Sequence, residues 1–372
     1  MENPFYEFNA TSPVEISYKA KDIDLSIVNS LRRVVLSEID NVGFFFDPND
    51  FSDDKDIKIL ENDSPLHNEF LQHRIALIPI NVNPKELENW DKDAYKFVLQ
   101  KENNTGSLMN VYTSDFKVID TKTNKENKEL AKRWFPADPI SKQHILITKL
   151  NNKPNSKIHI EAFAIIGQPL KSASFGMVSN LSIEFVVDEK AATKALNTFL
   201  ETNKDKASVA NLTHQFNSIE RERHYNRNKY REPSVFDIKM TSECSIPCKY
   251  IMQKAISILK DKVIRFQNSN YEIVNHNMLF SIIINDESHT LGNLYQSLVF
   301  NHYIRENNDN EYNINYVGYN VPHPLEKILL IKIKGDKLLI LDDVRTFVNK
   351  SCDYIYNMLN DIDNHWNTLS NK

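Results

Sequence analysis

Two stretches of the chain, 16–36 and 280–300, repeat the same order of apolar and polar positions. Each starts with a strand-like run, passes an acidic turn and continues into a segment whose apolar residues recur every three or four positions. This spacing predicts a strand followed by an amphipathic helix. The second copy aligns on the first without a gap: Asp22 with Asp286, Asn29 with Asn293, Val35 with Val299, and the apolar positions 27, 31 and 34 with 291, 295 and 298. Two copies of one half-buried unit predict an internal dimer in a single polypeptide.

Further strands and helices complete both copies. A strand over 13–19 leads into the first helix, for which Asp24 is a suitable N-cap. An amphipathic helix over 246–263 closes the first copy, and a long helix over 341–366 closes the second. Strand patterns occur at 157–166, 181–187, 235–240, 279–285, 312–319 and 327–334. This order of strands and helices predicts an α+β fold.

The segments between these elements divide the chain. Residues 1–48 and 158–264 are predicted to form a first dimerisation module of the strand–helix–sheet–helix type, and 279–372 a second. Residues 49–157, in which polar stretches separate short strand-like runs, are predicted to be an inserted, mostly β domain. The polar, Asn-rich segment 265–278 is predicted to be the linker.

The composition is that of an ordinary soluble protein, with 41% hydrophobic residues in a chain of 372. No run approaches about 18 consecutive apolar residues, and the first residues lack the basic and apolar regions of a signal peptide. Three cysteines are too few for a disulfide framework, which indicates an intracellular protein. A net charge of -5 argues against a protein whose main task is to coat nucleic acid.

No familiar catalytic or cofactor motif occurs in the sequence. The glycine-rich phosphate loops, H-E-x-x-H and G-x-S-x-G are all absent. The spacing of Cys244 and Cys248 suits a metal site, but two further ligands would be needed and no nearby cysteine supplies them. We therefore predict no catalytic residue, no metal and no cofactor.

The run Asp24-Leu-Ser-Ile-Val-Asn-Ser-Leu-Arg-Arg-Val-Val-Leu-Ser-Glu-Ile39 is followed by Asn68-Glu-Phe-Leu-Gln-His-Arg-Ile-Ala-Leu-Ile-Pro-Ile80. Together they closely resemble the alpha-like subunits of cellular RNA polymerases, which include bacterial alpha, the archaeal D-type subunit and the third-largest subunit of eukaryotic RNA polymerase II. Eukaryotic relatives of that subunit often carry a zinc-binding cysteine loop in their inserted domain. Residues 49–157 contain no cysteine, so we expect that feature to be lost here.

The second copy carries Asp286-Glu-Ser-His-Thr-Leu-Gly-Asn-Leu294 and Val317-Gly-Tyr-Asn-Val-Pro-His-Pro-Leu-Glu326. These runs are similar to the archaeal L-type subunit and the eleventh-largest subunit of RNA polymerase II. Cellular polymerases carry the two subunits as separate chains that heterodimerise, and their fusion resembles the arrangement in large DNA viruses that encode their own polymerase.

The resemblance implies a non-catalytic assembly subunit of a DNA-directed RNA polymerase. Its intramolecular heterodimer would nucleate the two largest catalytic subunits, and small polymerase subunits would be further partners. DNA and RNA would be contacted only indirectly, through the complex, and no membrane would be involved. The resemblance also implies a location in the host cytoplasm and the virion, with the nucleus as the alternative.

The same resemblance places the contacts between modules and with other subunits on the two signature helices and on the 68–80 element. The residues are Ile27, Asn29, Leu31, Arg32, Arg33, Val34, Val35, His73, Arg74, His289, Leu291, Gly292, Asn293, Leu294, Tyr295 and Leu298. Taken without the resemblance, Arg32 and Arg33 are typical solvated helix charges, and His289 is placed to cap its helix. A glycine inside a helix, as at position 292, indicates a close approach of another group to the backbone.

Two other functions stay open at this point. The dense polar and basic segment 218–232 suits a stand-alone nucleic-acid-binding protein, whose affinity would depend steeply on salt. An enzyme with an unrecognised site is the third alternative, and turnover of nucleotides by the isolated chain would indicate it.

Replacing Leu31 or Leu291 with Asp is expected to break the pairing of the two modules, because an unpaired charge would be buried. Assembly of each variant with the large polymerase subunits, measured by copurification, checks this expectation, and normal assembly would contradict it.

Overall fold

The computed structural model describes residues 3–49, 56–138, 140–204, 208–269, 271–276, 279–336 and 339–369. The chain divides into two compact units. Unit 1 comprises Met1–Val35, Asn180–Met240 and Ile251–Lys372, and unit 2 comprises Leu36–Ser179 and Thr241–Tyr250.

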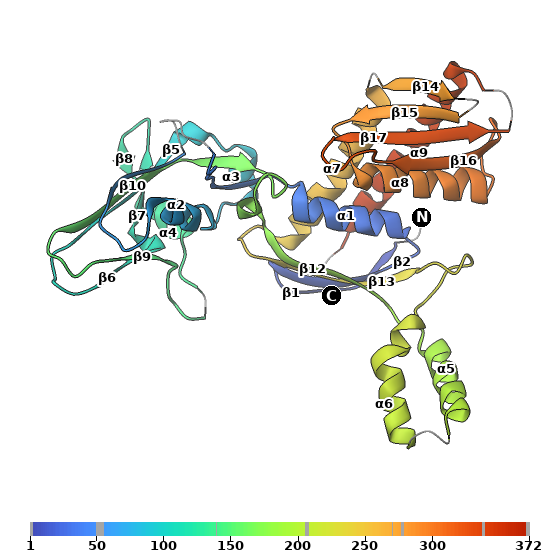
Figure 1. Ribbon diagram of the computed structural model, residues 1–372, viewed down its shortest axis with the longest axis horizontal. Helices are drawn as coiled ribbons and strands as arrows, with labels where there is room; N and C mark the ends of the chain where they lie inside the picture. Colours follow the sequence, from blue (N-terminus) through green and yellow to red (C-terminus); the bar gives the residue numbers. More distant parts are fainter. Residues whose placement is uncertain are drawn as a thin grey trace. The chain divides into compact units, whose positions relative to one another are not determined.

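Unit 1 is built on two four-stranded sheets whose strands follow the same order, β1-β2-β13-β12 in one and β14-β15-β17-β16 in the other. The strands of the first sheet are β1 (Phe5–Ser12), β2 (Glu15–Lys21), β12 (Val178–Phe185) and β13 (Val235–Ser242). Those of the second are β14 (Glu272–His276), β15 (Leu279–Asn285), β16 (Ile314–Asn320) and β17 (Ile328–Gly335). The helices are α1 (Leu25–Ser37) and α7 (Cys248–Asn268), then α8 (His289–Val299) and α9 (Leu341–Asn367). Figure 1 shows α1 and α8 between the two sheets.

The turn between strand and helix has the same backbone geometry in both modules. Asp22 and Asp286, the aligned acidic residues, have φ values of 55° and 58°. Asp tolerates this left-handed conformation better than most residues, which explains an acidic residue at both turns. The backbone N–H of Asp22 donates to Ser234 O over 2.9 Å, and that of Asp286 donates to Lys327 O over 2.7 Å. The two turns are therefore equivalent in structure as well as in sequence.

This equivalence extends to the end of each module. The same difference in residue number separates Ser234 from Lys327, the start of β13 from that of β17, and the start of α7 from that of α9. These positions are therefore equivalent in the two modules. The two modules differ instead in the connection before this part. In the second module 321–327 join β16 to β17, whereas in the first 186–234 join β12 to β13.

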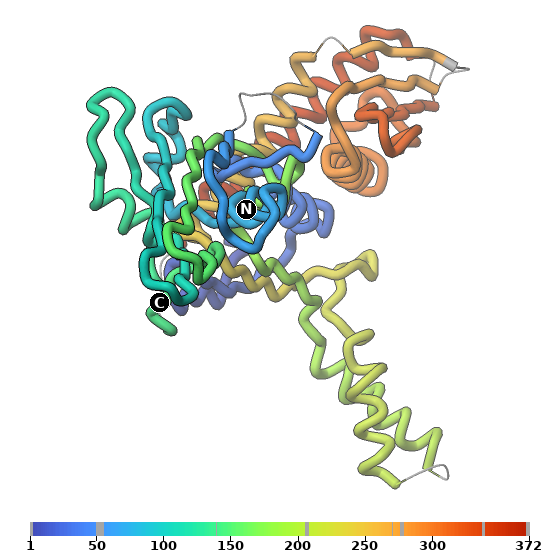
Figure 2. The backbone as a smooth tube through the Cα atoms, turned by 60° about the vertical axis from the view of Figure 1, so that its left-hand side comes forward, coloured from blue at the N-terminus to red at the C-terminus, as the bar shows by residue number. Residues whose placement is uncertain are grey.

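The longer connection contains a helical hairpin of α5 (Glu189–Thr202) and α6 (Val209–Ile219). Asp188 caps α5, because its carboxylate accepts hydrogen bonds from the N–H groups of Lys190 and Ala191. Figure 2 shows this hairpin projecting away from the sheet of the first module.

The predicted linker is mostly regular structure. Residues 265–268 form the end of α7, and Glu272–His276 form β14, which pairs antiparallel with β15. The residues 270, 277 and 278 lie outside those described. The many Asn residues of this segment lead to the prediction of a linker rather than a strand, because Asn is depleted in strands and common in turns.

Unit 2 contains a five-stranded sheet of order β4-β10-β5-β7-β8 and the pairs β3–β11 and β6–β9. Its strands are β3 (Asn41–Phe44), β4 (Ile57–Asn62), β5 (Tyr95–Asn103), β6 (Met109–Tyr112), β7 (Phe116–Asp120), β8 (Lys125–Glu126), β9 (Leu146–Leu150), β10 (Ser156–Ala162) and β11 (Ala164–Gly167). Its helices are α2 (Asn68–Ala76), α3 (Pro84–Glu88) and α4 (Lys128–Trp134). An aromatic cluster of Phe44, Phe97, Phe116, Trp134 and Phe135 fills its core.

Unit 2 is wider than the insertion predicted at 49–157. β10, which the prediction places in the first module, lies between β4 and β5 in the five-stranded sheet, and β11 pairs with β3. The alternating pattern identifies these runs as strands, but it carries no information about which sheet a strand joins.

The core of the second module is centred on Tyr295. This side chain is fully buried, and its hydroxyl lies 2.6 Å from Ser351 Oγ on α9. Its ring meets Phe266 of α7 edge-on, with 5.4 Å between ring centroids. Burial raises the pKa of Tyr295 well above its ordinary value and also raises the pKa of the Cys352 thiol.

Replacing Gly292 with Ala should destabilise α8. A Cβ at this position would lie 2.5 Å from Tyr319 Cδ2 and 2.7 Å from Leu329 Cδ1 on the sheet beneath the helix. We expect this clash to outweigh the better helix propensity of Ala, at a net cost of about 1–2 kcal/mol. Hydrogen exchange of the α8 amides measures the change, with Gln296→Ala in the same helix as the control. Unchanged or slower exchange in Gly292→Ala would contradict the close approach.

The buried phenol also predicts a dependence of stability on pH. The folded chain keeps Tyr295 neutral, whereas the unfolded chain releases that proton near the ordinary tyrosine pKa of 10.0. The free energy of unfolding should therefore be unaffected by this group below pH 10 and fall as the pH rises above it, by up to about 1.4 kcal/mol per pH unit. Urea titrations at pH 8 to 11 should show a shallower fall in Tyr295→Phe. Tyr316→Phe, at a tyrosine that is 47% exposed, is the control and should behave like the unaltered chain.

Candidate dimerisation interface

Helices α1 and α8 contact each other in an antiparallel arrangement. At one end Arg33 Nε donates to Thr290 Oγ1 over 2.9 Å, and Ser30 Oγ donates to Thr290 O over 3.3 Å. At the other end Asp24 accepts hydrogen bonds from Ser297 and Asn301. The start of each helix thus meets the later part of the other, as expected for a pair related by an approximate two-fold axis.

Asp24 connects the fold of one module to the surface of the other. Its carboxylate accepts from the Ser26 N–H over 2.8 Å, which confirms it as the N-cap of α1. The same carboxylate accepts from Ser297 Oγ at 3.0 Å and from Asn301 Nδ2 at 2.7 Å. The same side chain therefore caps its own helix and contacts the other module.

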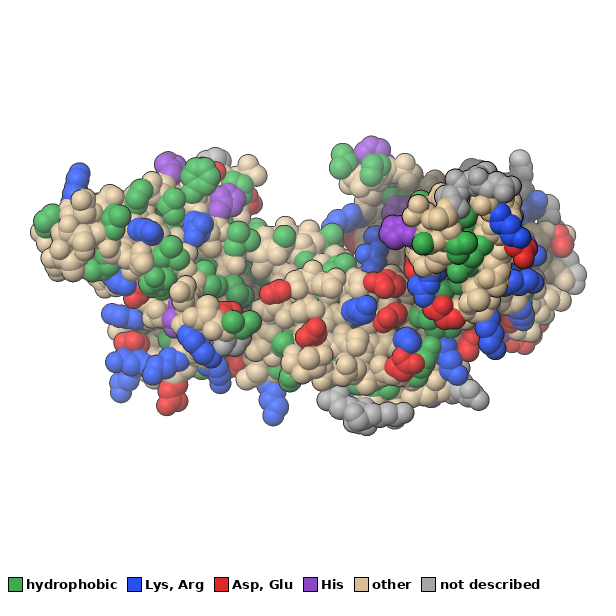
Figure 3. Space-filling model, turned by 90° about the horizontal axis from the view of Figure 1, so that it is seen from below, with side chains coloured by type: hydrophobic (Ala, Val, Ile, Leu, Met, Phe, Trp, Pro, Cys, Tyr) green, Lys and Arg blue, Asp and Glu red, His purple; other side chains and the backbone are tan. Residues whose placement is uncertain are grey.

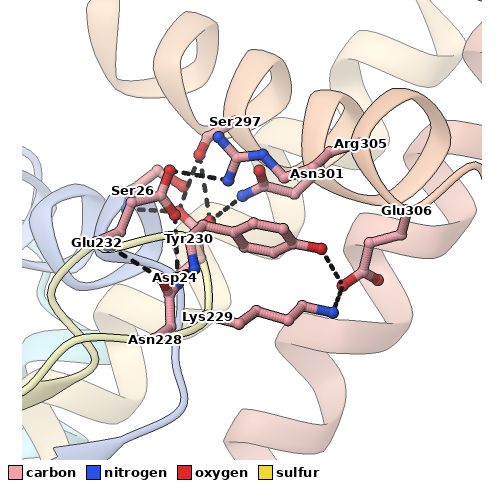
Figure 4. Close-up of polar contacts among 10 residues, drawn as sticks. All are labelled: Asp24, Ser26, Asn228, Lys229, Tyr230, Glu232, Ser297, Asn301, Arg305 and Glu306. Carbon is pink, nitrogen blue, oxygen red and sulfur yellow. Dashed lines mark hydrogen bonds and ion pairs between the residues drawn. The ribbon is translucent and has the colours of Figure 1, made fainter.

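A second polar cluster joins the loop before β13 to the helical segment that continues α8 (Figure 4). Lys229 Nζ lies 3.0 Å from Glu306 Oε1, and the Tyr230 hydroxyl lies 3.2 Å from the same oxygen. Arg305 lies 2.8 Å from Glu232 Oε1, and its guanidinium is 4.4 Å from the centroid of the Tyr230 ring. Asn228 fixes the loop from within, because its Oδ1 accepts from two backbone N–H groups of the loop. These contacts form a polar rim beside the helix pair.

The long helices α7 and α9 make further contacts between the modules. Lys260 Nζ lies 2.5 Å from Asp363 Oδ2, and Gln267 Nε2 donates to Asp353 Oδ1 over 2.8 Å. Residues later in α7 meet residues earlier in α9, so this helix pair is antiparallel as well.

One ion pair between the modules is almost completely buried. Lys262 of α7 lies 2.9 Å from Glu287, with side chains that are 8% and 10% exposed. A buried ion pair adds little net stability, but removing one partner leaves a costly unpaired charge.

Trp366 is an aromatic anchor at the end of α9. It is fully buried, and its ring lies 5.0 Å from that of Tyr18, 5.3 Å from Phe5 and 6.0 Å from Phe8. These three residues belong to the hairpin of β1 and β2 in the first module. Deeply buried tryptophans of this kind dominate the energetics of many interfaces.

The structure distributes the predicted α1 residues over two sides of the helix. Ile27 borders the same cleft as Leu298 of α8, and Arg33 contacts Thr290. Leu31 instead lines a small void with Phe5 and other residues of its own sheet. The four remaining residues are Val34 and Val35, which are buried, and Asn29 with Arg32, which hydrogen-bond each other within α1.

The predicted α8 residues are also divided. Asn293 borders the cleft, while Leu291, Leu294, Tyr295 and Leu298 are buried. The contacts of Gly292 confirm the close approach that the sequence indicates. The capping role considered for His289 is not observed, since Ser288 occupies the N-cap position and His289 Nδ1 lies 3.4 Å from the Tyr319 hydroxyl.

His73 and Arg74 lie in unit 2. The His73 ring meets Phe46 edge-on at 4.7 Å, and Arg74 donates to the carbonyl oxygens of Ile147 and Leu146 at 2.8 and 2.7 Å. Both are exposed and lie on α2, beside Phe70 and Leu77, which are 67% and 68% exposed. A contact of this surface with a large subunit stays a prediction.

Several contact residues are not among those predicted from the sequence, including Ser30, Thr290, Lys262, Glu287 and Trp366. Lys262 carries the clearest signal, because it continues the buried stripe formed by Ile251, Ala255 and Leu259. A charged residue inside an apolar stripe indicates a buried partner. Trp366 belongs to the periodic seam of the last helix, but nothing in its spacing indicates that the seam ends in the other module.

Within the described ranges of the chain, the structure contains no group of three or more His, Cys, Asp and Glu side chains that could hold a metal ion. Cys244 and Cys248 are both buried, and neither forms a disulfide. A search of the same residues for a helix long and apolar enough to cross a membrane finds none.

The chain is similar in sequence to known RNA polymerase subunits. The chain is 29% identical over 192 residues to the DNA-directed RNA polymerase subunit Rpo3 of Methanocaldococcus jannaschii, a match that covers 49% of this chain and 82% of the relative. It is 27% identical over 190 residues to the DNA-directed RNA polymerases I and III subunit RPAC1 of Saccharomyces cerevisiae, covering 45% of this chain and 52% of that relative.

Two models of the RNA polymerase Rpb3/Rpb11 dimerisation domain match this chain, one over 19–263 and the other over 280–365. The first segment contains α1 and most of α7, and the second contains α8 and most of α9, the four helices that make the contacts described above. Because the first match alone covers more than half of the 372 residues, the chain belongs to the RNA polymerase Rpb3/Rpb11 dimerisation-domain family and carries two such domains in one polypeptide.

Proposed function

We propose that the chain is a non-catalytic assembly subunit of a multisubunit DNA-directed RNA polymerase, in which its two modules form an intramolecular heterodimer. The observation that carries the proposal is the antiparallel contact of α1 with α8, in which Asp24 binds Ser297 and Asn301 while Arg33 binds Thr290. The relatives named above are subunits of DNA-directed RNA polymerases. Two large catalytic subunits would be held by the paired modules, and catalysis would belong to those partners.

The physical role of the heterodimer is to present one rigid surface to the large subunits. Each of the helices α1 and α8 buries one side on the sheet of its own module and the other side against the other module. Neither module is therefore complete alone. A covalent tether supplies the partner at about millimolar effective concentration, so pairing does not depend on the encounter of two chains. The proposed domain limits keep 279–372 as the second module and add β14 to it. A viral source, with assembly in the host cytoplasm and virion, stays a prediction.

The alternative of a stand-alone nucleic-acid-binding protein is not favoured by the contacts of 218–232. Arg221 pairs with Glu189 and Glu222, Arg223 pairs with Glu220, and Lys229 pairs with Glu306. At the right of Figure 3, basic and acidic side chains are interspersed on the surface. Cations paired in this way contribute less to phosphate binding than unpaired ones.

Purification of the full chain from its native cells tests the assembly role. We expect an affinity-tagged chain to copurify with two very large subunits at one copy each, quantified by mass spectrometry. Recovery of the chain alone, or with nucleic acid only, would contradict the proposal.

The intramolecular heterodimer has its own test in a chain with a protease site inserted after Ser269, between α7 and β14. After cleavage of the folded chain, the two fragments should stay together in size-exclusion chromatography. Trp366→Ala should separate them, because loss of a buried tryptophan costs about 3–5 kcal/mol. Trp134→Ala, which removes an equally buried side chain in unit 2, is the matched control and should leave the fragments paired. Separation of the unaltered fragments would contradict the heterodimer.

A further inference from the structure

We propose that the charges between the two modules select unlike pairs and reject like pairs, so that a second module cannot pair with another second module. The inference rests on the proposed heterodimer and adds the device that determines which partner is accepted. Two ion pairs support it, Lys262–Glu287 and Lys260–Asp363. The charged residues are compared with the residues at the equivalent positions of the other module.

The internal duplication assigns a counterpart to each charged residue. The alignment of Asp22 with Asp286 makes Ile23 the counterpart of Glu287 in the first module. The alignment of α7 with α9 makes Ile355 the counterpart of Lys262 in the second module. Ile23 and Ile355 are 6% and 0% exposed. One position of the interface therefore carries a buried ion pair, while its two-fold equivalent carries two isoleucines.

The equivalent position of the first module also lies beside α9. Ile23 borders a cleft together with Tyr354, Met358 and Ile362 of α9. Glu287 meets α7 at the corresponding position of the second module. The unlike pair thus matches charge with charge at one position and apolar with apolar at the other. This complementarity depends on each module supplying a different surface.

A pair of like modules loses this match at both positions. Two second modules would bury each Glu287 against the Ile355 of the other copy. Two first modules would bury each Lys262 against the Ile23 of the other. Both arrangements leave two charges without their partners in an apolar environment, which is strongly unfavourable.

The second ion pair acts in the same direction. In the unlike pair, Lys260 meets Asp363 at 2.5 Å, with side chains that are 15% and 16% exposed. The counterpart of Lys260 in α9 is Asp353, as the alignment of the two helices gives. Two second modules would therefore bring Asp353 of each copy against Asp363 of the other. Like charges placed together in this way discriminate against the wrong partner.

A charge swap in the cleavable chain tests the first ion pair. After cleavage, Glu287→Lys should weaken the association of the fragments by about tenfold or more, because two cations would be buried together. The double variant Lys262→Glu with Glu287→Lys should restore the affinity to within about threefold, since opposite charges face each other again. The control is the swap of Lys350 and Glu311, a 2.6 Å ion pair inside the second module, which should leave the affinity unchanged. A double variant as weak as the single one would overturn the role of this pair.

The rejection of like pairs has a separate test with two differently tagged second modules. Two cleaved chains are mixed, and capture through one tag should recover none of the other tag. Glu287→Ile with Asp353→Lys makes the like pair complementary, so this variant should be captured with both tags. Absence of dual capture in this variant would overturn the selection. If the unaltered fragments separate on cleavage, the heterodimer itself fails, and that result is distinct from fragments that pair regardless of their charges.

Discussion

Each module can bury only one side of its central helix, α1 or α8, on its own sheet. The other side must be buried against the second helix of the pair, and the arrangement of the two modules depends on this requirement. In α1, Leu31 packs toward the first sheet, whereas Ser30 and Arg33 reach α8. The side facing the other helix is therefore more polar than a module core, and it achieves specificity through hydrogen bonds with defined partners. A large buried apolar side chain is Trp366, which lies among the aromatic rings of the β1–β2 hairpin. Polar contacts at the helices give orientation and specificity, and burial of the tryptophan adds apolar stabilisation.

Much of this arrangement can be predicted from the sequence, because periodic patterns report on burial. The gapless alignment of two stretches predicts both strand–helix units, and the structure adds the same left-handed turn at Asp22 and Asp286. The pattern does not report which of two neighbouring surfaces a buried residue faces. Leu31 is for that reason predicted to pair the modules, and the structure places it beside a small void lined by residues of the first module. Contacts such as Arg33–Thr290 join residues far apart in the sequence, and no local pattern encodes them.

Comparison of the two modules separates the parts common to both from the parts that were added. The strand order is identical in the two sheets, and the last strand and helix of each module follow one constant shift. Additions to the first module occur at connections: unit 2 follows α1, and the α5–α6 hairpin replaces the short turn between β16 and β17. Connections tolerate insertions because few core contacts depend on them. The contact helices have kept their order along the chain, which is consistent with a surface whose geometry must be preserved.

A tethered pair has little need of charge selection once both modules exist, since the tether already favours the partner in the same chain. The order of synthesis provides a reason for both devices. The first module emerges before the second, and its exposed helix side is then available to first modules of neighbouring chains. A tether cannot act before its second end exists, whereas Lys262 opposes a pair of first modules from the moment it is buried. On this argument the charges oppose pairing of like modules before the second module is complete, and the tether favours the partner in the same chain afterwards.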